Sequence, residues 1–118
     1  MDQATKRVIW VGDSRDQLRS FPKAARRTVG AALNAAQSGL KHIDAKPLRG
    51  VGSGVFEIST RYDTNTYRAI YTVKLGENIY VLHVFQKKST RGIRTPKREI
   101  DLIKQRLRIA REMEEKNE

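Results

Sequence analysis

One face of an expected strand carries side chains that could act on a phosphodiester. Side chains alternate across a strand, so Glu57, Ser59 and Arg61 share one face of the strand that begins at residue 55, while Phe56 and Ile58 share the other. A carboxylate can accept a proton from a hydroxyl group, and a guanidinium can stabilise negative charge on phosphate. The polar face of this strand is therefore a candidate site.

Two later strands add cations and an aromatic ring. Arg68 lies at the start of the strand expected at 67–73. Phe85 ends the strand expected at 79–85, and Lys87 and Lys88 follow it closely. If the three strands are neighbours, these side chains surround one patch of the sheet. Such a patch suits RNA, because cations hold phosphate and a ring provides a surface on which a base stacks.

The same patch could also cleave RNA without a metal. That reaction requires a base that activates the 2′-hydroxyl, cations that stabilise the phosphorane and an acid that protonates the departing 5′-oxygen. The base could be Glu57, the stabilising cations Arg68 and Arg61, and the acid Lys88. We therefore predict a catalytic set of five residues: Glu57, Arg61, Arg68, Lys87 and Lys88.

Purely structural explanations exist for some of these residues. Glu57 could form a cross-strand ion pair with Arg61 or Arg68 that has no function. Phe85 could pack in the core, as most aromatic residues of strands do. An arginine inside a hydrophobic strand, as at Arg68, is harder to explain in this way.

Composition narrows the class of function. Lys and Arg number 24 against 13 Asp and Glu, a net charge of +11 that points to a polyanionic partner, foremost nucleic acid. Without cysteine there is neither a disulfide nor a thiolate nucleophile. His42 and His83 supply at most half of a metal shell and are expected in a loop and on a strand face, so we predict no metal and no cofactor. The short apolar runs indicate no signal or membrane segment and favour the cytoplasm.

Positive charge is concentrated near residue 90. Between Gln86 and Arg98 the chain carries cations and no acid, whereas it ends in a glutamate-rich segment. A run of like charge can be a merely solvated surface. We predict instead that its members outside the catalytic set bind RNA, together with the preceding ring: Phe85, Arg91, Arg94, Lys97 and Arg98.

The amino-terminal half is expected to hold one strand and two helices. The apolar run 8–11 indicates a buried strand, and Ser14 followed by Gln17 has the form of a capping box for a short helix to about Phe21. Pro22 can open a second helix, which Gly39 ends. We expect the two helices to form a hairpin against the sheet. Apolar residues at helical spacing mark the buried face of the second helix: Ala25, Val29, Ala32, Leu33 and Ala36.

The carboxyl-terminal half is expected to hold three strands and a helix. Strands at 55–58, 67–73 and 79–85 with short turns between them are typical of an antiparallel meander. The glycine-rich residues 46–54 precede a strand rather than a helix, so we interpret them as a turn instead of a phosphate-binding loop. Thr95 can cap the last helix and Pro96 can begin it. The buried face of that helix is expected to hold Ile100, Ile103, Leu107 and Ala110.

These elements predict one α+β domain over residues 1–118. We expect an antiparallel sheet of about four strands, with two amino-terminal helices packed on one side and a carboxyl-terminal helix.

Four short motifs carry a resemblance to a known family. They are KPLRG at 46–50, GVFEI at 54–58, YRAIY at 67–71 and, above all, VLHVFQKKS at 81–89 followed by Thr95-Pro96 and Glu99-Ile100-Asp101. The chain resembles the phage-derived, HigB-like branch of the RelE/ParE toxin superfamily. The resemblance implies a compact microbial RNase fold and a toxin of a type II toxin–antitoxin pair that cleaves messenger RNA on the ribosome. It also implies a cognate antitoxin as partner, often a helix-turn-helix repressor of the HigA type.

The resemblance also assigns roles to residues. Arg68 matches the arginine that contacts the scissile phosphate, and Lys87 and Lys88 match the basic pair where the leaving-group acid lies. Glu57 and Ser59 stand where RelE itself has lysines, and this departure leaves the general base open, with Glu57 as our candidate. Two other functions fit the sequence. A ParE-like inhibitor of DNA gyrase would not cut RNA, and a basic phage accessory protein would bind nucleic acid without catalysis.

Overall fold

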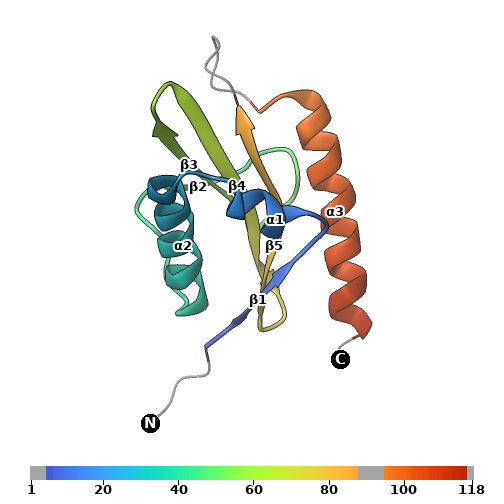
Figure 1. The fold of residues 1–118 in the computed structure, drawn as a ribbon. Coiled ribbons are helices and arrows are strands. Elements are labelled where there is room, and N and C mark those ends of the chain that lie inside the picture. Colours follow the sequence, from blue (N-terminus) through green and yellow to red (C-terminus); the bar gives the residue numbers. More distant parts are fainter. Residues whose placement is uncertain (1–4, 88–94, 117–118) are drawn as a thin grey trace.

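The structure, a computed structural model, describes residues 5–87 and 95–116 and has the helices α2 and α3 on opposite faces of one sheet (Figure 1). The elements follow in the order β1 (Arg7–Trp10), α1 (Ser14–Arg19), α2 (Lys23–Gln37), β2 (Ala45–Pro47), β3 (Val55–Tyr62), β4 (Asn65–Leu75), β5 (Asn78–Lys87) and α3 (Lys97–Lys116). The fold is α+β, as predicted from the order of strands and helices.

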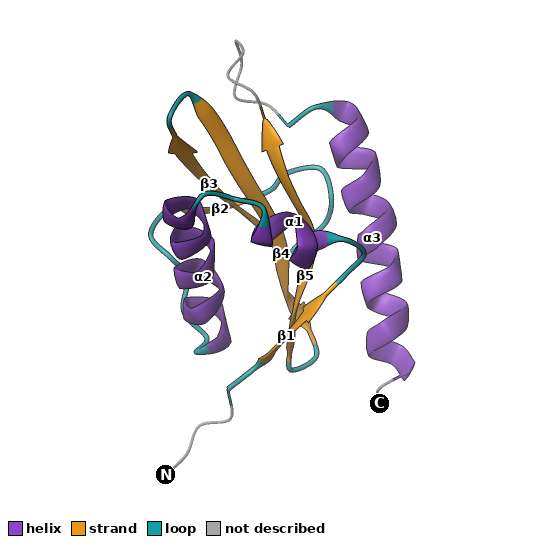
Figure 2. Ribbon diagram, viewed as in Figure 1, coloured by secondary structure: helices purple, strands orange, loops and turns teal. Residues whose placement is uncertain are grey.

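The sheet has five strands in the order β1-β5-β4-β3-β2, and it is mixed (Figure 2). The meander β3-β4-β5 is antiparallel, which confirms that part of the prediction. The expectation of about four antiparallel strands was wrong at both edges. At one edge β1 runs parallel to β5, because the helices α1 and α2 carry the chain away from β1 instead of a tight turn. At the other edge β2, of which Lys46 and Pro47 were expected to belong to a turn, pairs with β3.

Helix α2 covers one face of the sheet. All five residues predicted for its apolar side are buried, and with Ile58, Tyr71 and Val81 they form the core on this face. Pro22 occupies the N-cap position, so the helix begins one residue later than expected. Gly39 follows its end with a φ of +79°, a conformation that glycine adopts without strain.

Helix α1 corrects two expectations. The hydroxyl of Ser14 does not cap the helix but lies 2.8 Å from the carbonyl oxygen of Val11 and 3.2 Å from that of Val81. The helix ends at Arg19, earlier than the expected Phe21, and it packs against β5. A buried hydroxyl needs hydrogen-bond partners, and the carbonyl groups near β5 supply them.

Helix α3 covers the opposite face. Ile103, Leu107 and Ala110 are buried as predicted, and Ile100 is partly buried beside them. The helix begins one residue later than expected, since the carbonyl oxygen of Pro96 accepts from the backbone N–H of Ile100. Among the described residues, no helix has both the length and the apolar character needed to cross a membrane.

A β-bulge in β5 changes which side chains face α3. Ile70 of β4 stands opposite His83, but the next residue, Tyr71, stands opposite Val81, so Leu82 is an extra residue in β5. As a result Leu82 lies in the core beneath α3, and His83 contacts α3 as well. Beyond the bulge Phe85 also faces α3.

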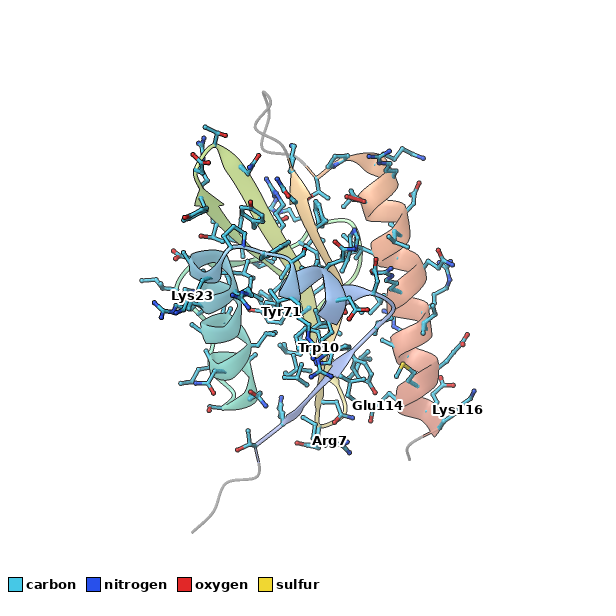
Figure 3. The ribbon with its side chains drawn as sticks, viewed as in Figure 1. Arg7, Trp10, Lys23, Tyr71, Glu114 and Lys116 are labelled. Atoms are coloured by element: carbon cyan, nitrogen blue, oxygen red, sulfur yellow. The ribbon has the colours of Figure 1, made fainter. Side chains whose placement is uncertain are left out.

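The end of α3 is bonded to the sheet. Glu114 Oε1 accepts from Asn78 Nδ2 at 2.9 Å and from the Tyr80 hydroxyl at 2.8 Å. Figure 3 labels Glu114 near the carboxyl end of α3. The glutamate-rich end of the chain is therefore attached to β5 at this residue.

Candidate active site

The predicted catalytic residues Glu57 and Arg68 meet on the face of the sheet that α3 covers. Arg68 Nη1 lies 2.9 Å from Glu57 Oε2. The register places Ser59 opposite Arg68 and Phe85 on the other side of Arg68, while Lys46 of β2 stands opposite Glu57. The alternation expected for β3 thus holds, and its polar face adjoins cations from the strands on both sides.

A hollow of about 400 Å³ opens beside this ion pair. The described residues that line it are Asp44, Lys46, Glu57, Ser59 and Arg68. Each of these five side chains carries a hydroxyl or a charged group. A space of this size and polarity can hold one nucleotide unit with its phosphate against the arginine.

The arginine in this site is largely enclosed. The side chain of Arg68 is 7% exposed and that of Glu57 is 16% exposed. A charge at this depth is costly unless it is paired, and the Glu57 carboxylate pairs it. A second donor reaches the same carboxylate oxygen, because Thr95 Oγ1 lies 3.1 Å from Glu57 Oε2. Of the two partners that the sequence offered for this carboxylate, Arg61 and Arg68, the ion pair is formed with Arg68.

Two further members of the predicted catalytic set lie in the next row of the sheet. Arg61 of β3 and Lys87 of β5 both stand opposite Thr66 of β4, on either side of it. Alternation puts this row on the same face as Arg68. Lys88 lies outside the described residues, so the structure gives no position for the proposed leaving-group acid.

The predicted RNA-binding residues are placed only in part. Lys97 and Arg98 are exposed in the first turn of α3, and Lys97 pairs with Asp101 at 3.4 Å. Arg91 and Arg94 lie outside the described residues. Phe85 is 7% exposed and belongs to the core beneath α3, with its ring stacked on His83 at a centroid distance of 4.7 Å. Base stacking on Phe85 stays a prediction, and it would require more of the ring to be exposed.

His83 is part of a polar network that the sequence did not indicate. Its Nε2 lies 3.2 Å from Glu99 Oε1, and its Nδ1 lies 3.2 Å from Arg106 Nη1. Arg106 also donates to the carbonyl oxygen of Leu82 and, through Nη2, to Asp13 Oδ1 at 2.9 Å. Because an arginine can only donate, Nδ1 accepts and Nε2 carries the proton that it gives to Glu99.

Burial lowers the pKa of His83 below its ordinary value of 6.5, although the carboxylate of Glu99 acts in the opposite direction. The pKa of Asp13 is also lowered, because the Arg106 guanidinium donates a hydrogen bond to this carboxylate and attracts it, which outweighs its slight burial. The network therefore joins β5, α3 and the loop after β1 through a neutral imidazole. The spacing of Glu99 and Arg106 puts both residues on one side of α3, and this spacing could have pointed to the network once His83 was known to be buried beneath that helix.

The comparison with protein families gives one match that covers most of the chain. The family described as "Phage derived protein Gp49-like (DUF891)" matches residues 16–108. The chain belongs to the phage-derived Gp49-like family. The phage-derived character expected from the sequence is thereby confirmed, while the HigB assignment stays a prediction.

Other comparisons add little to the family assignment. Among curated proteins nothing matches the Gp49-like chain. Among solved structures, the toxin–antitoxin complex RelBE2 from Mycobacterium tuberculosis is similar, with 23% sequence identity and a TM-score of 0.46 over 73% of this chain and 95% of that one.

The family match includes all the parts of the Gp49-like domain that build the site. Residues 16–108 contain β3, β4, β5 and the first half of α3, and thus Glu57, Arg68, His83 and Thr95. In the described part of the chain, no group of three or more His, Cys, Asp or Glu residues is placed to hold a metal ion. The chemistry available from these side chains is proton transfer by a carboxylate beside a cation that binds phosphate.

Proposed function

We propose that this Gp49-like protein is the toxin of a type II toxin–antitoxin system and cleaves messenger RNA on the ribosome. The observation that carries the proposal is the ion pair of Glu57 and Arg68 at the wall of a polar hollow. Membership of a phage-derived family and the resemblance of the strand motifs to RelE-type toxins support it. A net charge of +11 suits a polyanionic substrate.

The proposed reaction is a transesterification within the RNA strand. Glu57 accepts the proton of a ribose 2′-hydroxyl, and the 2′-oxygen attacks the neighbouring phosphorus. The bond from phosphorus to the 5′-oxygen breaks, and an acid returns a proton to that oxygen. The products are a 2′,3′-cyclic phosphate and a free 5′-hydroxyl.

Arg68 stabilises the phosphorane, since a guanidinium keeps its charge at any physiological pH and presents several donors to phosphate oxygens. Arg61 and Lys87, one row further along the sheet, would hold the flanking phosphate. We assign the leaving-group acid to Lys88. The exposed cations Lys97 and Arg98, with Arg91 and Arg94, would bind the RNA strand beyond the hollow.

The proposed function includes a partner and a compartment. A toxin that cuts messenger RNA needs an antitoxin, and we propose a cognate helix-turn-helix protein of the HigA type. Both would act in the cytoplasm, where translating ribosomes are found.

Cut-site mapping in bacteria tests this function. Expression of the wild-type chain should arrest growth and leave new 5′-hydroxyl ends within translated messages. Glu57→Gln and Arg68→Ala should each reduce cleavage by about 100-fold or more, and Lys88→Ala with Arg68→Ala should relieve the arrest. Thr28→Ala, on α2 at the other face, is the control that should keep full activity.

Other outcomes would point to other functions. Growth arrest with intact messages and a DNA-damage response would indicate a gyrase inhibitor. Salt-sensitive binding of nucleic acid without cleavage, even with ribosomes present, would indicate an accessory binding protein.

A further inference from the structure

The segment that leads into α3 contacts the proposed general base. Thr95 lies 38 residues from Glu57 in the chain, and its hydroxyl donates to Glu57 Oε2 at 3.1 Å. The same oxygen forms the ion pair with Arg68 Nη1, at a distance of 2.9 Å. Two donors, one from the strand β4 and one from the segment before α3, therefore converge on one carboxylate oxygen.

We propose that Thr95 is a positioning residue that orients the Glu57 carboxylate for proton abstraction. The proposal rests on the proposed function, because it concerns the base of that reaction. The terminal torsion of a glutamate is broad, so a single ion pair leaves the carboxylate free to rotate. A second donor on Oε2 restricts that rotation and leaves Oε1 as the oxygen that takes the proton from the ribose.

Thr95 does not have the role that a threonine just before a helix commonly has. At this place the side chain commonly caps the helix by accepting from a backbone N–H of the first turn. Here Pro96 lies between Thr95 and the helix, and its carbonyl oxygen accepts from Glu99 and Ile100. The hydroxyl of Thr95 is instead directed to the sheet, where it donates to Glu57.

Thr95 can hold Glu57 only if the start of α3 is itself fixed. Glu99, in the first turn, is bonded to His83 of β5, and His83 is bonded in turn to Arg106 two turns further along α3. Ile103 lies between these contacts and is fully buried against the sheet. The helix is thus attached to β5, the strand next to the one that carries Arg68. This arrangement meets the requirement that a positioned base be supported by a rigid second layer of contacts.

The test is a set of Thr95 variants assayed for cleavage of a defined messenger RNA on programmed ribosomes. We expect Thr95→Ala and Thr95→Val to lower kcat by about tenfold and to leave KM within about threefold, since the residue orients a base rather than binding substrate. Thr95→Ser keeps the hydroxyl and should keep kcat near the wild-type value. Thr28→Ala, a threonine on α2, is the matched control.

A double-mutant comparison identifies the group through which Thr95 acts. If Thr95 acts through Glu57, Thr95→Ala should have almost no further effect in a Glu57→Gln background. Multiplicative losses in the double variant, an unchanged kcat in Thr95→Ala, or failure of Thr95→Ser to retain activity would overturn the proposal.

The failure of the proposed function would look different. In that case the wild-type chain itself would not cleave the message, and the role of Thr95 in catalysis would fall with the reaction. Wild-type cleavage that Glu57→Gln does not reduce would remove Glu57 as the base, and with it the positioning role. Thermal unfolding of each variant confirms that the compared proteins are folded.

Discussion

Arg68 and Glu57 pair diagonally across two neighbouring strands. Arg68 stands opposite Ser59 and Glu57 stands opposite Ile70, yet Nη1 and Oε2 are 2.9 Å apart. A diagonal contact is within reach of these long side chains, and it leaves the small Ser59 beside the guanidinium. The hollow that receives substrate in our proposal lies where a larger residue at position 59 would otherwise fill the space.

The Glu57 and Arg68 pair should be coupled in stability as well as in catalysis. Removing either partner leaves the other charge poorly compensated in a largely enclosed place, so Glu57→Gln and Arg68→Met should each destabilise the protein. We expect a coupling energy of about 1–3 kcal/mol from a double-mutant cycle, reduced from a fully buried pair because Glu57 retains some exposure. Denaturant unfolding of the four proteins measures it. Additive effects would contradict the contact.

Stability should depend on pH through His83. Because burial lowers its pKa from 6.5, the unfolded chain binds a proton more readily than the folded chain. The stabilising contribution of the neutral imidazole is therefore complete above about pH 7.5 and declines as the pH falls through about 6.5. Unfolding free energies at several pH values should show wild type losing stability on acidification relative to His83→Gln.

His42→Gln serves as the control for the other histidine. It should keep the wild-type pH dependence, since His83 is still present. Parallel pH curves for wild type and His83→Gln would show that the His83 network does not resist protonation.

Substitutions on the side of α3 that faces the sheet should destabilise the protein more than substitutions on its exposed side. Leu107 is 4% exposed and Ile109 is 40% exposed, although only one residue separates them on the helix. Leu107→Ala should cost about 2–4 kcal/mol because it leaves a cavity, whereas Ile109→Ala should cost less than about 1 kcal/mol. Chemical denaturation compares them. Equal losses would mean that α3 does not pack as described.

Glu114 should stabilise the carboxyl end of α3, and its neighbour should not. Glu114→Ala removes an acceptor from Asn78 and from the Tyr80 hydroxyl, which we expect to cost about 1–3 kcal/mol. Glu115→Ala, at an exposed position, should change stability by less than about 0.5 kcal/mol. Thermal melts at one pH measure both. A smaller loss in the first variant than in the second would exclude these hydrogen bonds.

Features set by local pattern were predictable from the sequence. The buried side of α2 follows from the spacing of small apolar residues such as Ala25 and Val29, and the meander follows from short turns between strands. The alternation of side chains along β3 and the short turn before β4 also indicated that Glu57 and Arg68 could lie on one patch of the sheet. Each of these features depends on residues near one another in the chain.

Features that depend on distant partners were not predictable. The parallel pairing of β1 with β5 joins residues about 70 positions apart, such as Val8 and Ile79. Ser14 and Thr95 both have residue types that cap helices, but each hydroxyl is drawn to a group from another element. A local propensity gives way where a hydroxyl group is removed from solvent and finds an acceptor on a neighbouring element.

The extra residue Leu82 reverses the alternation of side chains along β5. Before it, odd-numbered residues such as Val81 point toward α2, and after it odd-numbered residues such as Phe85 point toward α3. If Leu82 instead took a regular place in the alternation of β5, Lys87 would point to the face of the sheet opposite to Arg68. One unpaired apolar residue thus decides that the two cations lie on the same face of the sheet.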